Sequence, residues 1–381
     1  MSRIEPLATA VSTAAAWTKP LSLEDRHGLI DAIGRQDRLG WLLDGQSDLP
    51  ALRSSLLQSR QMPTLVAILE ALRSHALRLG EPNVADLARI LLFNAHWHTG
   101  DLDRCQSIRS EIDALPPGPH DALFRVFVSF ERHTVAQYRD SLSILGALRE
   151  VPAGQARNAE RFIGADLDLV IATWSIWNRI EALDYDGLDC DIASAADVLE
   201  GRRRCSHKTA ALYALALGFF YLTHDAVALA RRCLEFALNH AVADGGLWRP
   251  RILSALCLCE HQGGNVAASH DLLEETLGTL PRHFGPVGWM LNIVDALHRH
   301  HRPDEAKALL ARAFRDIVRK GEVGNEIWCH VMALEIGPPS AAGFDAGGVF
   351  ARAAALGMRR ACRTLIPAGA GRQAHGPAGF A

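Results

Sequence analysis

Apolar residues recur at intervals of three and four positions along most of the chain. In the segment from Asp225 to Ala241, for example, Val227, Ala230 and Leu234 continue into Ala237 and Ala241. This spacing places apolar side chains on one face of a helix and leaves the charged ones on the other. The segment from Pro303 to Lys320 shows the same arrangement. The pattern therefore predicts a series of amphipathic helices.

Strand signals are scarce by comparison. The Asp-Gly pairs at 186–187 and 244–245 are not flanked by the alternation typical of a hairpin. Glycine and proline interrupt the helical pattern at short intervals, which leaves room for helices of roughly 12 to 18 residues. We expect an all-α fold, an α-solenoid of antiparallel helix hairpins. The expected organisation is an N-terminal helical cap (1–60), helical repeats (61–335), a C-terminal helical cap (336–367) and a disordered tail (368–381).

Four segments resemble one another, at 94–115, 219–241, 258–280 and 295–314. Each runs from an apolar helix end through a tight turn into an amphipathic helix. Small residues occupy one matching position, and a second set follows seven residues later. The first set is Cys105, Ala230, Ser269 and Ala306, and the second is Ile112, Ala237, Thr276 and Ala313. Small side chains allow two antiparallel helices to pack closely, so we expect Ala230, Ala237, Ala306 and Ala313 to be buried.

The repeats are spaced by 39 and 37 residues from Ala230 to Ser269 and from Ser269 to Ala306. Such a period is typical of helical-hairpin repeats. The longer interval between Cys105 and Ala230 has room for two more repeats, which the sequence does not align. With the phrase LYALALGFFYLTHDAVALARRCLEFALNHA, this period resembles the tetratricopeptide superfamily, and in particular the sensor region of MalT-type LuxR-family regulators.

The resemblance covers about residues 60 to 335 and implies a right-handed superhelix with a concave binding surface. The GxxxxGK[ST] phosphate loop of those regulators is not found, and nothing near the C-terminus resembles a helix-turn-helix. Their ATPase and DNA-binding modules are therefore not expected here. The resemblance implies that this chain corresponds to the part of those regulators that binds a ligand or another protein.

Charge and cysteine content narrow the class of partner. Forty Lys and Arg residues against 43 Asp and Glu residues give a net charge of -3, which argues against binding to nucleic acid or to an anionic membrane. Eight cysteines without a CxxC pair favour reduced thiols and a cytoplasmic location. The first 17 residues lack the basic start of a secretory peptide and are expected to form a helix. The uncharged stretch 209–224 is shorter than the ~20 apolar residues of a membrane-spanning helix.

Possible metal and catalytic groups each have a simpler interpretation. His96 and His98 point in different directions on a helix and cannot share one ion. His298 and His301 share a face, but we interpret them as part of a solvated turn. The acidic run LDYDGLDCD (183–191) does not match the spacing of a calcium loop. We interpret the pair Cys257 and Cys259 as core residues. No cofactor, metal or catalytic residue is predicted.

The candidate binding residues lie in two places. Arg202, Arg203 and Arg204 form the densest basic patch, which either docks acidic groups of a partner or offsets the dipole of the preceding helix. Aromatic residues gather in the C-terminal half, and Trp248, beside Arg249 and Arg251, is the best candidate for a groove contact. The predicted binding set is Arg202, Arg203, Arg204, Tyr213, Phe220, Trp248 and Arg249.

These observations favour a binding function over a catalytic one. The hypothesis is a bacterial regulatory or adaptor protein whose concave surface recognises a protein, a peptide or a small effector, with no direct contact to nucleic acid or membrane. The alternative is a helical enzyme with a cofactor or metal site assembled from residues distant in sequence.

Overall fold

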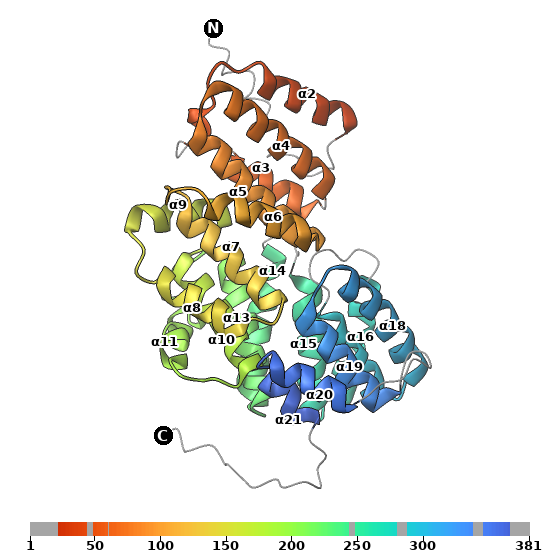
Figure 1. Cartoon of the computed structure of the whole chain (residues 1–381). Helices are drawn as coiled ribbons and strands as arrows, with labels where there is room; N and C mark the ends of the chain where they lie inside the picture. Colours follow the sequence, from red (N-terminus) through yellow and green to blue (C-terminus); the bar gives the residue numbers. More distant parts are fainter. Residues whose placement is uncertain are drawn as a thin grey trace.

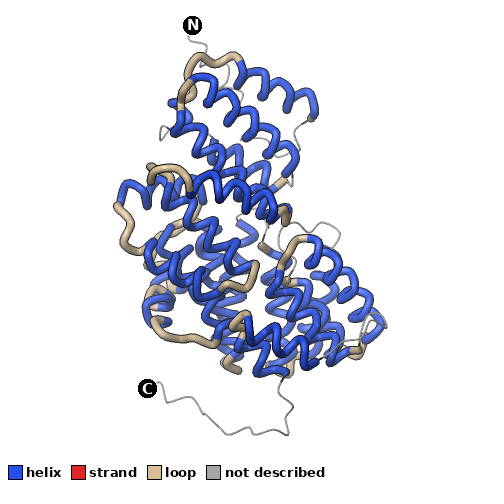
Figure 2. The backbone as a smooth tube through the Cα atoms, viewed as in Figure 1, coloured by secondary structure: helices blue, strands red, loops and turns tan. Residues whose placement is uncertain are grey.

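The computed structural model describes residues 22–43, 49–59, 61–243, 248–279, 288–337 and 346–365. Helices and loops account for all of these residues, and no strand occurs among them (Figure 2). The predicted all-α class is therefore confirmed. No helix in these ranges is both long enough and apolar enough to cross a membrane. The helix expected over 1–17 and the tail expected at 368–381 lie outside the described residues.

The described part of the chain begins with helix α2 (Leu23–Gly34), which packs on α4 (Met62–Leu79). The Ser22 hydroxyl accepts a hydrogen bond from the Asp25 amide at 3.1 Å, and the Asp25 carboxylate accepts one from the Ser22 amide at 3.0 Å. This capping box satisfies two amides that the first turn of a helix leaves without partners. Leu29 and Ile33 form the buried face of α2.

Consecutive helices then pair as antiparallel hairpins, beginning with α4 and α5 (Pro82–Thr99) (Figure 1). The short helices η1 (Gly40–Leu43) and α3 (Leu49–Gln58) precede them. The other helices are, in order, α6 (Leu102–Asp113), α7 (Asp121–Thr134), α8 (Tyr138–Leu148), α9 (Ala153–Ile163), α10 (Leu167–Ala182), α11 (Leu188–Ile192), α12 (Ala195–Leu199), α13 (His207–Thr223), α14 (Val227–Ala243), α15 (Arg249–Gln262), α16 (Val266–Thr279), α17 (Met290–Arg299), α18 (Pro303–Arg319), α19 (Val323–Ile336), α20 (Ala346–Ala355) and α21 (Arg359–Leu365).

The small residues predicted at the hairpin seams are buried. Cys105, Ala230, Ser269 and Ala306 are all 0% exposed, as are Ala237, Thr276 and Ala313. Ile112, the largest residue of the set, is the exception and is half-buried. Two of these residues, Cys105 and Ser269, show the register of the seam, because each contacts the backbone twelve positions earlier. The Cys105 thiol donates to the carbonyl of Phe93, and the Ser269 hydroxyl donates to that of Cys257 at 2.9 Å.

The same register locates the repeats that the sequence does not align. The Ser141 hydroxyl donates to the carbonyl of Ser129 at 2.9 Å, also across twelve positions, so α7 and α8 form a further hairpin of the series. In the next pair, Asp191 takes the place of the small residue and accepts a hydrogen bond from Arg179, twelve positions before it, at 2.7 Å. A small hydroxyl and a buried carboxylate thus replace alanine at these two seams.

The C-terminal helices return to contact the first half of the chain. Helix α21 packs on α10, and α19 packs on α7 (Figure 1). One apolar cluster joins the two parts and includes Tyr138 and Ala182 from the first half with Ile327, Val331 and Met358 from the last helices. We call this set of contacts the closure. The closure also includes the contact between the turns at 99–102 and 319–322, which is described below.

Candidate functional site

Two glycines allow the closure to form at the turns. Gly100 ends α5 with a φ of 79°, and a Cβ atom built on it would lie 2.3 Å from Cγ of Lys320. Gly321 has a φ of 64°, and its Cβ would lie 2.7 Å from Cδ1 of Leu102. Both the left-handed backbone and the close approach favour glycine. The α5–α6 turn and the α18–α19 turn therefore meet.

Glu181, near the end of α10, forms the polar part of the closure. One of its carboxylate oxygens accepts a hydrogen bond from Nε1 of Trp328 at 2.8 Å, and the other accepts one from Arg360 at 2.7 Å. The guanidinium of Arg360 also stacks over the Trp328 ring, 4.6 Å from its centroid. One carboxylate therefore holds α19 and α21 against α10.

Cationic side chains gather next to the closure. Burial lowers the pKa of His98 well below its ordinary value, and the charges of Arg53, Lys208, Arg251 and Lys320 lower it further. These five residues, which we call the basic centre, come from five separate parts of the chain. The charges of four cations therefore act on the neutral imidazole of His98, which lies in a region of positive potential.

Two members of the basic centre cap helix α9. Arg53, which is 3% exposed, donates to the carbonyl of Phe162 at 2.9 Å, and Lys208 donates to the next carbonyl, Ile163, at 2.6 Å. These are the last carbonyls of α9, where cations offset the helix dipole. Burial lowers the pKa of Arg53 to about 10, so the side chain stays protonated at neutral pH. This pair has a structural role and also contributes to the positive potential.

The other cations belong to α15 and to the α18–α19 turn. The Arg251 guanidinium lies 5.1 Å from the centroid of the Trp248 ring, within the range of a cation–π contact. Burial lowers the pKa of Arg251 to about 10, and the charge of Glu322 opposes this shift. Burial also lowers the pKa of Lys320. Nε1 of Trp248 is buried and, among the described residues, has no hydrogen-bond acceptor.

Aromatic rings connect the basic centre to the neighbouring helices. Trp97 contacts His98 with 4.8 Å between ring centroids, and it contacts Trp174 of α10 at 6.2 Å. Trp174 stacks on Phe130 at 4.2 Å and meets the edge of His133 at 5.2 Å. These rings form one aromatic cluster that joins α5, α7 and α10. The sequence does not predict this cluster because its members lie far apart along the chain.

The predicted arginine patch is largely engaged in local contacts. Arg202 pairs with Asp197 at 2.8 Å and also with Glu200. Arg203 donates to the Ser194 hydroxyl at 2.9 Å and pairs with Asp168 of α10. These contacts hold the segment before α13 against α10, which is a structural role different from the predicted offset of a helix dipole. Arg204 is exposed.

The two aromatic residues predicted from α13 do not join the arginines. Tyr213 is 0% exposed, and its hydroxyl donates to the carbonyl of Asp191 at 2.8 Å, so it is a core residue and lines no surface. Phe220 lies near the opposite end of α13 from the arginines, thirteen residues after His207, and packs against Tyr185 and His224. At 1.5 Å per residue, that separation is about 20 Å.

The remaining two predicted residues lie at the start of α15. Arg249 pairs with Glu275 of α16 on the surface. Trp248 is half-buried and faces Arg251, which the sequence had suggested as its neighbour in a groove. The structure thus brings Trp248 to the basic centre and leaves Arg249 outside it.

Three histidines that the sequence does not connect come together from α15, α16 and the α17–α18 turn. The ring of His300 lies 5.2 Å from that of His261 and 5.7 Å from that of His270. In the described part of the chain, however, no group of three His, Cys, Asp or Glu side chains is arranged to hold a metal ion. Cys257 and Cys259 are 1% and 0% exposed, as expected for core residues.

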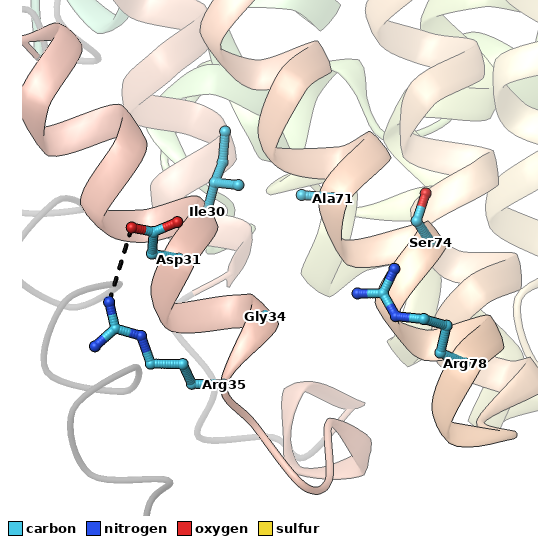
Figure 3. Close-up of a pocket in the computed structure, with 7 residues that line it drawn as sticks. All are labelled: Ile30, Asp31, Gly34, Arg35, Ala71, Ser74 and Arg78. Atoms are coloured by element: carbon cyan, nitrogen blue, oxygen red, sulfur yellow. Dashed lines mark ion pairs between the residues drawn. The ribbon is translucent and has the colours of Figure 1, made fainter.

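An open groove lies far from the closure, between α2 and α4 (Figure 3). Asp31 and Arg35 form an exposed ion pair at 3.7 Å on one side, and Ser74 and Arg78 stand on the other. Arg78 also contacts Nδ1 of His75 at 3.0 Å. The groove has charges of both signs and lacks buried unsatisfied donors among its lining residues, so we place the candidate site at the basic centre.

Comparison with models of known protein families and with curated proteins found no match to this chain. The interpretation of the site therefore rests on its geometry. That geometry offers hydrogen-bond donors and positive charge, which bind and orient an acceptor.

Proposed function

We propose that this protein acts by binding, in a regulatory or adaptor role, and that the basic centre beside the closure is its binding site. The supporting observation is that the closure collects His98, Arg251 and Lys320 from three distant segments. Burial lowers the pKa of Arg251 and of Lys320, and groups perturbed in this way cluster at functional sites.

The surroundings of the basic centre favour recognition over catalysis. Its groups are donors or cations, and the carboxylate whose charge acts on both Arg251 and Lys320 is Glu322. Glu322 accepts a hydrogen bond from Asn325 at 2.7 Å and is 2% exposed. A general base needs access to a substrate proton, and an almost fully buried carboxylate next to two cations is poorly suited to that role.

The rival remains a helical enzyme with a site assembled from distant residues. The resemblance to tetratricopeptide-like sensor regions adds to the case for binding, as does the series of hairpin seams, since repeat arrays commonly present binding surfaces. The expected ligand is a protein, a peptide or a small effector.

A thermal-shift screen of the full chain with metabolites, nucleotides and metal ions tests this proposal. We expect at least one organic ligand to raise the melting temperature in a saturable manner. Each stabilising compound is then incubated with the protein and analysed by mass spectrometry. Recovery of the compound unchanged supports a binding role, whereas its conversion, or stabilisation by a metal or redox cofactor, would support the enzyme.

A further inference from the structure

Three imidazole rings meet where the α15–α16 and α17–α18 hairpins pack together. The ring of His300, in the α17–α18 turn, lies 5.2 Å from that of His261 on α15 and 5.7 Å from that of His270 on α16. Helix α17 packs on both α15 and α16. The three rings, which we call the histidine cluster, therefore lie at the contact between two consecutive hairpins.

A hydrogen bond joins His300 to the seam of the first hairpin. The Ser269 hydroxyl donates to the carbonyl of Cys257 at 2.9 Å, so Ser269 Oγ accepts from Nε2 of His300 at 2.8 Å. The neutral His300 ring therefore carries its proton on Nε2. Nδ1 of His261 is buried and has no hydrogen-bond partner among the described residues. A proton added to that nitrogen would find no acceptor among them.

The charges that act on His300 come from all sides of the turn. Burial lowers the pKa of His300, and the charges of His261, His270, Arg302 and His301 lower it further. Each of these four groups is cationic when it is charged. A proton on His300 therefore adds a positive charge beside others of the same sign.

The carboxylates of the surrounding helices are engaged elsewhere or exposed. The engaged ones pair with arginines: Glu260 of α15 with Arg231, Glu274 of α16 and Glu305 of α18 with Arg302, Glu275 of α16 with Arg249, and Asp295 of α17 with Arg299. Asp271 of α16 and Asp304 of α18 are exposed, where water screens their charges. In the described part of the chain, none of these carboxylates forms an ion pair with the histidine cluster.

We infer that the histidine cluster is a proton-sensitive contact, which holds the α15–α16 and α17–α18 hairpins together at neutral pH and loosens in mild acid. Neutral imidazoles pack ring against ring, whereas protonated imidazoles at these distances repel one another. This inference concerns regulation of the fold. It goes beyond the proposed function and does not depend on the basic centre.

The direction of the pH dependence follows from His300. Its pKa is lower in the folded chain than the ordinary value of 6.5, so the unfolded chain binds more protons in mild acid. The stability that the contact contributes is therefore present above pH 6.5 and is lost as the pH falls below that value. Helix α18 begins at Pro303, next to the cluster, and ends at Arg319, next to a turn of the closure. The loosened hairpin thus includes the helix that connects the two.

Packing without pH sensitivity is the alternative explanation. His270 is exposed, and His261 and His300 are half-buried, so water could hydrate the added charges without any movement of the hairpins. The two explanations differ in how the α17–α18 hairpin responds to acid.

Hydrogen–deuterium exchange of the full chain at about pH 7.5 and about pH 5.5, corrected for the intrinsic pH dependence of exchange, distinguishes them. We expect protection of α17 and α18 to fall by about threefold to tenfold in acid. In His300→Gln the loss should be at most about twofold, because the amide still donates to Ser269 but takes up no proton. His261→Phe keeps a ring beside His300 without its charge and should also reduce the acid effect.

His298→Gln is the matched control, because His298 is an exposed histidine on the same helix, and this variant should keep the full acid effect. Circular dichroism at about pH 7.5 confirms that each variant is folded. If His300→Gln does not fold, His261→Phe and His270→Gln carry the test. Equal protection of α17 and α18 at both pH values in the parent would overturn the inference. The same acid effect in the folded cluster variants as in His298→Gln would overturn it too, and both results leave the proposed function standing.

Discussion

Removing the carboxylate of Glu181 should loosen the closure without disturbing the repeats. In Glu181→Ala, Trp328 loses the acceptor of its Nε1 at 2.8 Å, and Arg360 loses its ion-pair partner at 2.7 Å. The side chain of Arg360 is 32% exposed, whereas that of Glu181 is 13% exposed. In the variant, water can therefore hydrate the guanidinium of Arg360 and replace part of the lost ion pair.

The magnitude follows from these two contacts. An unsatisfied, partly buried indole N–H costs about 1 to 3 kcal/mol, and a partly exposed ion pair contributes up to about 1 kcal/mol. We therefore expect a loss of about 1 to 4 kcal/mol from the free energy of the closed state. Glu181→Gln should lose less, because the amide oxygen still accepts from Trp328.

Hydrogen–deuterium exchange measures where this loss falls. Exchange should become faster in α19, α20 and α21, while the α13–α14 and α15–α16 hairpins keep their protection, because local opening uses only the contacts of the segment that opens. Glu335→Ala is the control, since Glu335 is exposed on α19. If Glu181→Ala and Glu335→Ala exchange alike, the carboxylate does not hold the closure and the reasoning fails.

Three further predictions concern stability. Ala306→Leu should overpack the seam of α17 and α18 and cost roughly 1 to 3 kcal/mol, whereas Ala308→Leu on the exposed face should leave the melting midpoint nearly unchanged; equal midpoints would disprove the seam register. Gly100→Ala should lower the melting temperature, because Gly100 has a φ of 79° and a Cβ atom there would overlap Lys320. Gly154→Ala in α9 should not, because a Cβ atom there has no neighbour within 4 Å. The reverse order of melting temperatures would contradict the closure geometry. Because burial lowers the pKa of His98, the unfolded imidazole binds protons that the folded one does not, so stability falls as the pH drops below the ordinary value of 6.5. Urea unfolding between pH 7.5 and 5 measures this loss of the free energy of unfolding. The loss should be smaller in His98→Gln than in the parent protein, by up to about 1.4 kcal/mol per pH unit. Parallel curves for the two proteins would refute the assignment of this pH dependence to His98.

The sequence predicts well those features that repeat locally. The seam at Ser269 and Ala306 follows from a small residue at a fixed distance from each turn, and both positions are buried. The seams at Ser141 and Asp191 escaped alignment because their side chains differ in chemistry from alanine, although they keep the same twelve-residue register. Geometry is repeated there, whereas residue identity is not.

The candidate site shows where such prediction stops. Tyr213 was expected on a surface because it is aromatic, but α13 is apolar on nearly all sides and packs against neighbours on several of them, so no polar face indicates its orientation. The closure depends on Glu181 meeting Trp328 and Arg360, 147 and 179 positions later. Single contacts at such separations leave no periodic signal in a sequence.

The closure also limits how this chain can change in length. An open array of hairpins tolerates the gain or loss of a whole unit, since each unit contacts only its neighbours. Here a duplication or deletion between Gly100 and Lys320 would move one turn away from the other and separate Glu181 from Arg360. Surface loops remain free to vary, but the number of hairpins between the two turns is held constant by the geometry at its ends.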